Sequence, residues 1–196
     1  MLLKSAILSV ANLIEKSARK LGEITSWFSL GILISVLAAV TAGAMGANEL
    51  LNWGFHIPLL GDNLTINDVF DLEWHFFAVM VMAGGTYAYL DDRHVRSDLF
   101  YSGLSDRAKK WVDTIGDVFL LLPFAAVMCW LSIGFVQRSF NSGEKSDYGG
   151  MMDRFAIKSV IPIGFAILFL VVLARVIKRL IGPKTRLVAS DTTDES

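Results

Sequence analysis

Three histidines and one cysteine are the side chains of this sequence that most often bind metals or haem. His56 falls between two apolar segments, His75 near the start of the second segment and His94 just past its end. An axial haem pair needs two ligands at similar depth on facing helices, so these positions disfavour a haem-binding redox subunit. Cys129 stands alone, which excludes an intrachain disulfide and predicts a packing role.

No nucleophile with a neighbouring base and orienting group is apparent, and there is no phosphate-binding glycine loop. We therefore expect a protein that is not an enzyme, with no catalytic residues, no metal site and no cofactor of its own.

Ion-coupled transport is the other chemistry to test, because it needs ionisable side chains at membrane depth. Four apolar segments cover about residues 24–47, 69–90, 113–135 and 155–177, and none has an ionisable side chain near its midpoint. Near the segment ends, where water or snorkelling lowers the cost of a charge, stand Glu73, His75, Asp113, Asp117, Lys158 and Arg175. A proton-coupled exporter is therefore disfavoured.

These segments also predict the architecture. The chain is 54% hydrophobic with a mean hydropathy of +0.52, and a bilayer core needs about 20 helical residues. A cleaved signal peptide has an apolar core of only about 7–15 residues, so we expect the first span to be retained. We predict an all-α integral membrane protein: a single domain over residues 1–180 with four transmembrane helices, then a disordered tail over 181–196.

Basic residues predict the orientation. Fourteen of the 18 Lys and Arg residues fall in 1–23, 91–112 and the tail from Arg175, whereas the loop 48–71 has none. By the positive-inside rule both termini are cytoplasmic. Nucleic-acid binding is not expected, because the basic residues flank membrane spans and form no separate patch.

Residues 2–21 predict an amphipathic helix. Apolar residues share one broad face at 100° per residue, with only Leu8 misplaced, and Lys4, Lys16 and Arg19 lie on the other face. Such a helix either lies in the inner-leaflet interface with its lysines near anionic headgroups, or packs against helices of a partner.

Small residues recur at intervals of four in two spans. They are Gly31, Ser35, Ala39, Gly43 and Ala47 in the first span, and Gly84 and Ala88 in the second. This spacing lets two helix backbones approach closely in a membrane. The sequence leaves open whether the stripes face sister helices or a separate subunit.

Two prolines, Pro123 and Pro162, fall inside predicted spans. Each removes a backbone donor and predicts a bend or a local break. Their neighbours are apolar, which favours a tolerated kink over a transport site.

The stretch from Trp74 to Asp98 carries a resemblance to a known family. It contains W-H-F-F at 74–77, G-G-T-Y-A-Y-L at 84–90 and H-V-R-S-D at 94–98, and later stretches read G-E-K-S at 143–146 and I-P-I-G-F at 161–165. Together they resemble the small membrane (Q) subunit of tripartite ATP-independent periplasmic (TRAP) transporters. The resemblance covers about residues 24–178, and residues 151–153 depart from the family pattern.

This resemblance implies a non-catalytic subunit of a sodium-driven importer of an organic acid, such as sialic acid or a C4-dicarboxylate. The implied partners are a large multi-span subunit, which binds substrate and sodium and moves like an elevator, and a periplasmic binding protein. The small subunit would brace the large one and help to dock the binding protein. The alternative is a stand-alone four-helix membrane protein acting as an exporter or a redox-complex subunit.

Two polar groups are candidate partner or lipid contacts. At the inner end, Arg93, His94, Arg96 and Asp98 would pair with each other, with lipid phosphates or with the large subunit, or would only fix topology. At the outer end, Glu73 and His75 would bond to a partner or face water, and Trp74 suits the headgroup belt.

The outer loop 48–71 is unusually apolar and also acidic. It has four acidic residues and no Lys or Arg among several apolar and aromatic side chains. It would either cover the outer end of the bundle or receive the binding protein, and the need to bury an apolar patch favours the cover.

Overall fold

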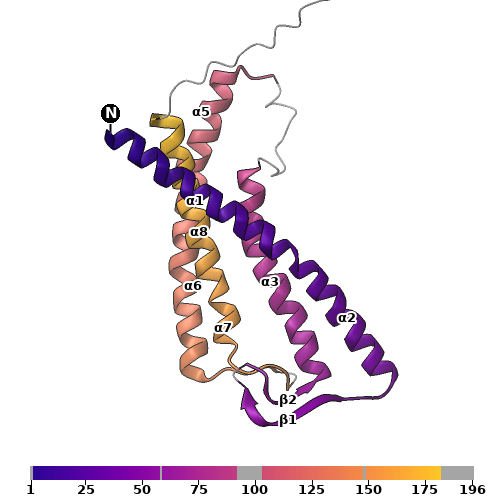
Figure 1. The fold of residues 1–196 in the computed structure, drawn as a ribbon. Helices are drawn as coiled ribbons and strands as arrows, with labels where there is room; N and C mark the ends of the chain where they lie inside the picture. The colour runs from indigo at the N-terminus through magenta and orange to yellow at the C-terminus, as the bar shows by residue number, and fades with distance from the viewer. Residues whose placement is uncertain (1, 58, 92–102, 148, 182–196) are drawn as a thin grey trace, which may run out of the picture.

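The computed structural model describes residues 2–57, 59–91, 103–147 and 149–181, which are mostly helical (Figure 1). The helices are α1 (Leu2–Ser26), α2 (Phe28–Ala44), α3 (Ile66–Leu90), α5 (Asp106–Gly116), the π-helix η1 (Asp117–Leu121), α6 (Leu122–Ser142), α7 (Phe155–Lys158) and α8 (Val160–Ile181). The predominantly helical class is as predicted. The predicted tail over 181–196 lies outside the described residues, apart from its first position.

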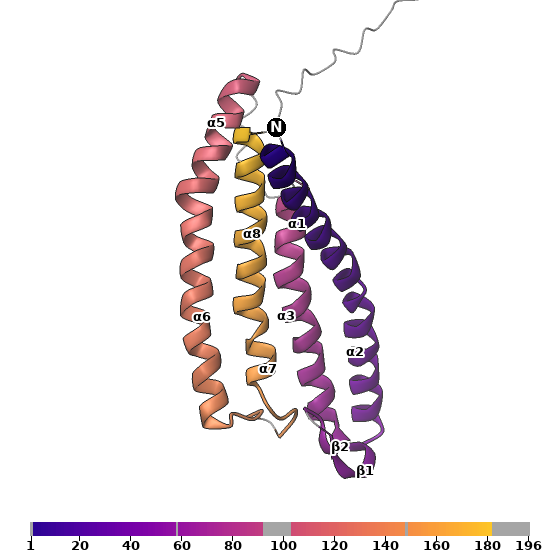
Figure 2. The ribbon, with the colours of Figure 1, turned by 60° about the vertical axis from the view of Figure 1, so that its left-hand side comes forward.

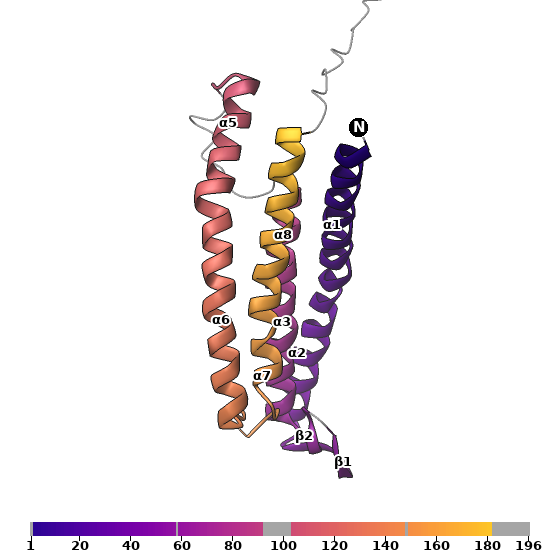
Figure 3. The ribbon, with the colours of Figure 1, turned by 90° about the vertical axis from the view of Figure 1, so that its left-hand side faces the viewer.

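The helices form an elongated bundle. In Figure 2, α6, α8, α3 and α2 follow one another across the structure, and each contacts its neighbour in this row. Figure 3 shows the same bundle from another side, with α1 apart from α6. The loop 143–154 and two short strands lie at one end, which we call the hairpin end. The end of α8 and the start of α5 lie at the other end, which we call the basic end.

Among the described residues, three helical stretches are long and apolar enough to cross a membrane: Leu3–Ala44, Arg107–Ser142 and Phe155–Ile181. The remaining predicted span, residues 69–90, corresponds to α3. This helix is 25 residues long but is not among these three. Its first turns carry Asp68, Asp71 and Glu73, which lower its hydropathy. Large side chains such as Trp130, which is 78% exposed, cover the outside of the bundle, as lipid contact requires.

Helix α1 packs partly against other helices of its own chain. It continues almost directly into α2 and crosses both α3 and α8 (Figure 1). Ala11 and Ala18 are buried, and Ala18 joins a core cluster with Tyr89, Leu90, Val171, Val172 and Val176. The predicted alternatives, lipid or a partner's helix, were incomplete because the chain's own α8 and α3 cover part of the apolar face. Only contacts between distant segments reveal this packing.

The two prolines mark local changes of helix type. A proline ring clashes with the carbonyl four residues earlier, and that position is Phe119 for Pro123 and Lys158 for Pro162. Phe119 lies within η1, and α7 ends at Lys158 before α8 begins at Val160. The predicted local breaks are present.

Loop 48–71 contains an element that the sequence reading did not predict, a two-stranded antiparallel hairpin of β1 (Glu49–Ile57) and β2 (Gly61–Thr65). Inside it, Trp53 Nε1 donates to the Gly61 carbonyl at 3.0 Å. Thr65 and Asp68 then cap α3 by exchanging side-chain and backbone hydrogen bonds. The hairpin therefore leads directly into α3 and fixes where that helix starts.

Candidate functional site at the two ends of the bundle

Asp117 organises the basic end. Its Oδ2 accepts hydrogen bonds from the Tyr89 hydroxyl at 2.8 Å and from Arg179 Nη1 at 2.6 Å. The three residues come from η1, α3 and α8, and Asp117 is buried. Because a buried carboxylate is costly unless it is paired and hydrogen-bonded, this contact holds the three helices at one relative position.

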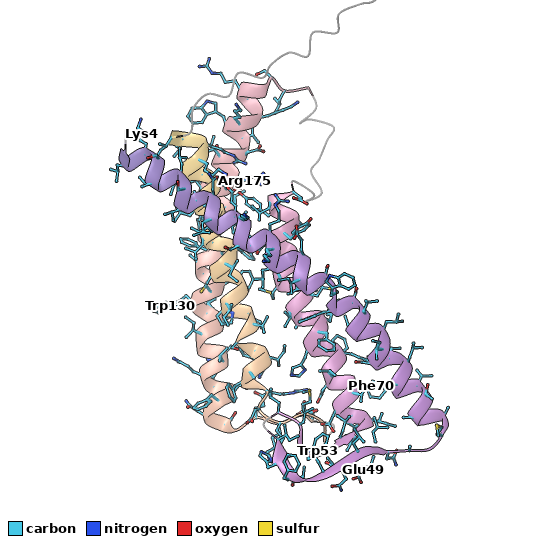
Figure 4. All side chains as sticks on the ribbon, viewed as in Figure 1. Lys4, Glu49, Trp53, Phe70, Trp130 and Arg175 are labelled. Carbon is cyan, nitrogen blue, oxygen red and sulfur yellow. The ribbon has the colours of Figure 1, made fainter. Side chains whose placement is uncertain are left out.

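Arg175 closes the C-terminal end of α3. Its Nη1 donates to the Tyr89 carbonyl at 2.6 Å and its Nη2 to the Leu90 carbonyl at 3.4 Å. The guanidinium also lies 5.0 Å from the centroid of the Tyr89 ring. Figure 4 labels Arg175 in the half of the bundle toward the basic end. The last carbonyls of a helix lack partners inside the helix and carry partial negative charge, so a cation from α8 suits this position.

Two ion pairs attach α1 to the same end. Lys178 Nζ lies 2.7 Å from Glu15 Oε2 and joins α8 to α1. Arg19 pairs with Asp91, the residue that follows α3, and also lies 5.8 Å from the centroid of the Tyr87 ring. We call the residues of these contacts the basic-end lock; they are Glu15, Arg19, Tyr89, Asp91, Asp117, Arg175, Lys178 and Arg179.

The sequence predicts that water or snorkelling lowers the cost of Asp117 and Arg175, whereas the structure gives both charges partners within the chain. Both bond to other helices of the chain. A usable signal was present, because acids and bases occur at the same predicted depth in different spans. These pairs are not visible when each span is considered alone. The neighbouring candidates Arg93, His94, Arg96 and Asp98 lie outside the described residues.

The first small-residue stripe faces a sister helix over part of its length. A Cβ added to Gly31 would lie 2.8 Å from the Phe76 ring of α3, and Ser35 and Ala39 are buried. After Ala39 the buried position moves to Ala42, because steps of four drift from a period of 3.6. Two members of the stripe leave this interface: Gly43 has open space around it, and Ala47 follows the end of α2.

The second stripe lies on an open surface. A Cβ added to Gly84 would meet no atom within 4 Å among the described residues. Gly84 lines a hollow of about 580 Å³ with Ser26, Trp27 and Met80, where α1, α2 and α3 meet. Ala88 is half-buried one turn further on. The packing of the described residues therefore does not require a glycine at position 84.

The polar residues at the start of α3 lie near the hairpin end. His75 Nδ1 donates to the Asp71 carbonyl at 2.6 Å. Its Nε2 and the Oε1 of Glu73 are buried without a hydrogen-bond partner among the described residues. Trp74 is largely exposed and stacks edge-on against Phe77. Neither buried atom faces solvent, so each has hydrogen-bonding capacity that the described part of the chain leaves unused.

The loop 143–154 is fastened to α3 and to the hairpin. The Met151 amide donates to Asp71 Oδ2 at 3.0 Å, and the Met152 amide donates to the Leu59 carbonyl at 2.9 Å. Glu144 pairs with Lys158, and the hydrogen bond from Lys158 lowers the pKa of the Glu144 carboxyl below its ordinary value. The hairpin and this loop are thus connected to each other, and Leu51 and Phe55 of the hairpin stay exposed.

Within the described residues, no group of three or more His, Cys, Asp or Glu side chains is placed to hold a metal ion. The polar contacts instead join helices to one another and connect the loops to α3. Together with the long apolar stretches, this arrangement is that of a helical membrane protein whose polar side chains hold its own helices together.

The comparisons agree with this class. The model of the family "Tripartite ATP-independent periplasmic transporters, DctQ component" matches residues 59–182, so the chain belongs to the DctQ family of TRAP transporter small subunits. The match begins later than the predicted resemblance and leaves out α1 and α2. No curated protein and no solved structure matches the chain.

Proposed function

We propose that the chain is the non-catalytic small permease subunit of a sodium-driven TRAP transporter that imports an organic acid. Sialic acid, C4-dicarboxylates and similar carboxylates are the proposed cargo. The family match over residues 59–182 carries this proposal. Substrate and sodium would bind in the large subunit, and this chain would brace that subunit while the elevator moves. The basic-end lock supports a bracing role, because it joins four helical segments through charged contacts.

We also propose that α3 is the fourth membrane span. It is 25 residues long and packs between α2 and α8. Its acidic residues lie in the first turns beside the hairpin, and no Asp, Glu, Lys or Arg follows from Trp74 to Leu90. Polar groups near a helix end reach water at modest cost, so α3 suits a span supported on both sides by helices of its own chain.

The proposed orientation has the basic end in the cytoplasm and the hairpin end in the periplasm of a bacterial inner membrane. The distribution of Lys and Arg supports it, since most of them lie in segments that flank the basic end. The periplasmic binding protein would then contact the hairpin end. Exposed Leu51 and Phe55 beside the acidic Glu49 and Asp62 provide an apolar and negative surface there.

Reconstitution tests this function directly. Proteoliposomes with the large subunit and this chain, supplied with the binding protein, should take up labelled organic acid only under an inward sodium gradient. Omitting the chain should abolish uptake or strongly reduce it. If the chain alone exported a cation or bound haem, the stand-alone alternative would replace the proposal. Sodium-dependent uptake that does not change when the chain is omitted would also contradict it.

A further inference from the structure

An apolar groove of about 280 Å³ runs between α1 and α8 where they cross. Its lining has no polar residue and includes Ala6, Ile7 and Ala11 from α1, and Leu170, Leu173 and Ala174 from α8. Ala11 and Ala174 are each 3% exposed and form the floor. Val10 and Leu170 also line the groove and are 57% and 47% exposed, so it opens to the surface.

Water is a poor occupant of this groove. The volume would hold several waters at about 30 Å³ each, but a bound water needs two to four polar partners. A partner helix is also a poor fit, because a helix with side chains is about 10–12 Å across. A flexible hydrocarbon chain meets both conditions, since it is apolar and thinner than a helix.

Charge at one end of the groove identifies the rest of the ligand. Lys4 is exposed in the first turn of α1, just before the lining residues Ala6 and Ile7. On α8, Lys178 follows Ala174 by one turn, and its ammonium is partly neutralised by Glu15. An apolar slot with a cation at its end matches an acyl chain attached to an anionic headgroup. We propose that this groove binds one acyl chain of an anionic phospholipid, whose phosphate lies near Lys4.

This proposal depends on the membrane location and not on the transported substrate. A lipid there would fill the space where α1 leaves α8, and so would complete the contact between the amphipathic helix and the bundle. Loss of sodium-driven uptake would therefore leave the lipid proposal intact, and loss of the lipid would leave the choice of cargo intact.

Native mass spectrometry of the full chain in detergent, with phosphatidylglycerol or phosphatidylcholine added, tests the ligand. The chain should retain phosphatidylglycerol in preference to phosphatidylcholine. Lys4→Gln should weaken that retention on the order of fivefold, as expected for one lysine at an anionic surface. Lys16→Gln is the matched control, because Lys16 is exposed on another side of α1. Equal losses in both variants, or no preference in the parent chain, would overturn the proposal.

The groove itself is tested by filling it. Ala6→Phe adds a ring to the exposed lining and should reduce lipid retention severalfold, whereas Asn12→Phe, at an exposed position of α1 outside the lining, should not. Circular dichroism confirms that both variants keep their helices. A photoreactive residue at position 6, in membranes that also contain the large subunit, should crosslink to lipid. A crosslink to a polypeptide would assign the groove to a protein partner and reject the lipid.

Discussion

Asp117 in η1 and Arg179 in α8 are 62 residues apart, and a hydrogen bond of 2.6 Å joins Asp117 Oδ2 to Arg179 Nη1. The Tyr89 hydroxyl bonds to the same oxygen from a third helix. Asp117 is the first residue of η1, and η1 leads into α6, which carries Pro123. One carboxylate therefore sets the position of three helices at the basic end, and it is the contact on which the bracing role most depends.

Replacing Asp117 by Asn should destabilise the chain by about 3 kcal/mol, because Arg179 would remain partly buried without its anion. Tyr89→Phe should cost less, about 1 kcal/mol, since it removes one neutral donor and keeps the ring. Unfolding of the purified chain in mixed micelles of increasing denaturing detergent measures both losses.

Asp113→Asn is the matched control for this pair. Asp113 Oδ2 lies 4.0 Å from Arg179 Nη2, beyond hydrogen-bond distance, so its loss should cost less than the loss of Asp117. Equal destabilisation by Asp113→Asn and Asp117→Asn would show that general negative charge, and not the short contact, stabilises the end.

The pair of Arg19 and Asp91 should contribute less to stability. The Arg19 side chain is 43% exposed, and pairs that reach solvent contribute about 0–1 kcal/mol. Arg19→Glu should therefore loosen α1 without unfolding the bundle, and Arg19→Glu with Asp91→Arg should recover part of the loss. Limited proteolysis at α1 measures the loosening. A double variant that is cleaved faster than both single variants would contradict direct pairing.

The sequence predicted the long helices well because apolar length is a local property. Segment 155–177 became α7 and α8 with a break where Pro162 requires it, and the stripe through Ser35 and Ala39 does lie at a helix interface. The basic-end lock was missed because its contacts join residues 28 to 163 positions apart. The hairpin was missed because its strands carry no regular alternation of polar and apolar residues.

Gly22 was not selected from the sequence, yet it sets the approach of α1 to α3. A Cβ added there would lie 2.6 Å from the Tyr87 Cβ, an atom fixed to the backbone. Gly22→Ala should therefore push the helices apart and cost about 1–3 kcal/mol. Gly43→Ala, in open space on α2, should be neutral or stabilising by up to about 1 kcal/mol. The same unfolding assay in mixed micelles compares them, and equal stabilities would refute close packing at Gly22.

Protonation of Glu144 at low pH should make the loop 143–154 more mobile. The hydrogen bond from Lys158 lowers the pKa of Glu144 in the folded chain. The stabilisation is therefore fully present above the ordinary carboxyl value of about 4.3 and is lost as the pH falls through the lowered value. A spin label at Lys145 should become mobile only below about pH 4. Lys158→Met should make the label mobile already at pH 7, and a label that stays immobile in that variant would contradict the role of this pair.

Gly84 offers the most direct test of the proposed assembly. Its surroundings are open within the described chain and line the hollow beside Trp27, so Gly84→Leu should leave the isolated chain stable. If the large subunit packs a helix into this hollow, the added side chain should reduce copurification of that subunit severalfold, because close packing in membranes depends on small residues. Copurification from solubilised membranes, with uptake in proteoliposomes, measures the effect.

Gly134→Leu is the matched control, because Gly134 is a helical glycine of α6, at the opposite edge of the row from α2 (Figure 2). A Cβ added to Gly134 would meet only the end of the Arg138 side chain, at 3.8 Å. Both substitutions therefore add the same bulk to a surface that the chain's own packing leaves open. If only Gly84→Leu reduces copurification of the large subunit, the partner lies on α2 and α3. If only Gly134→Leu reduces it, the interface lies on α6 and the hollow at Gly84 is rejected.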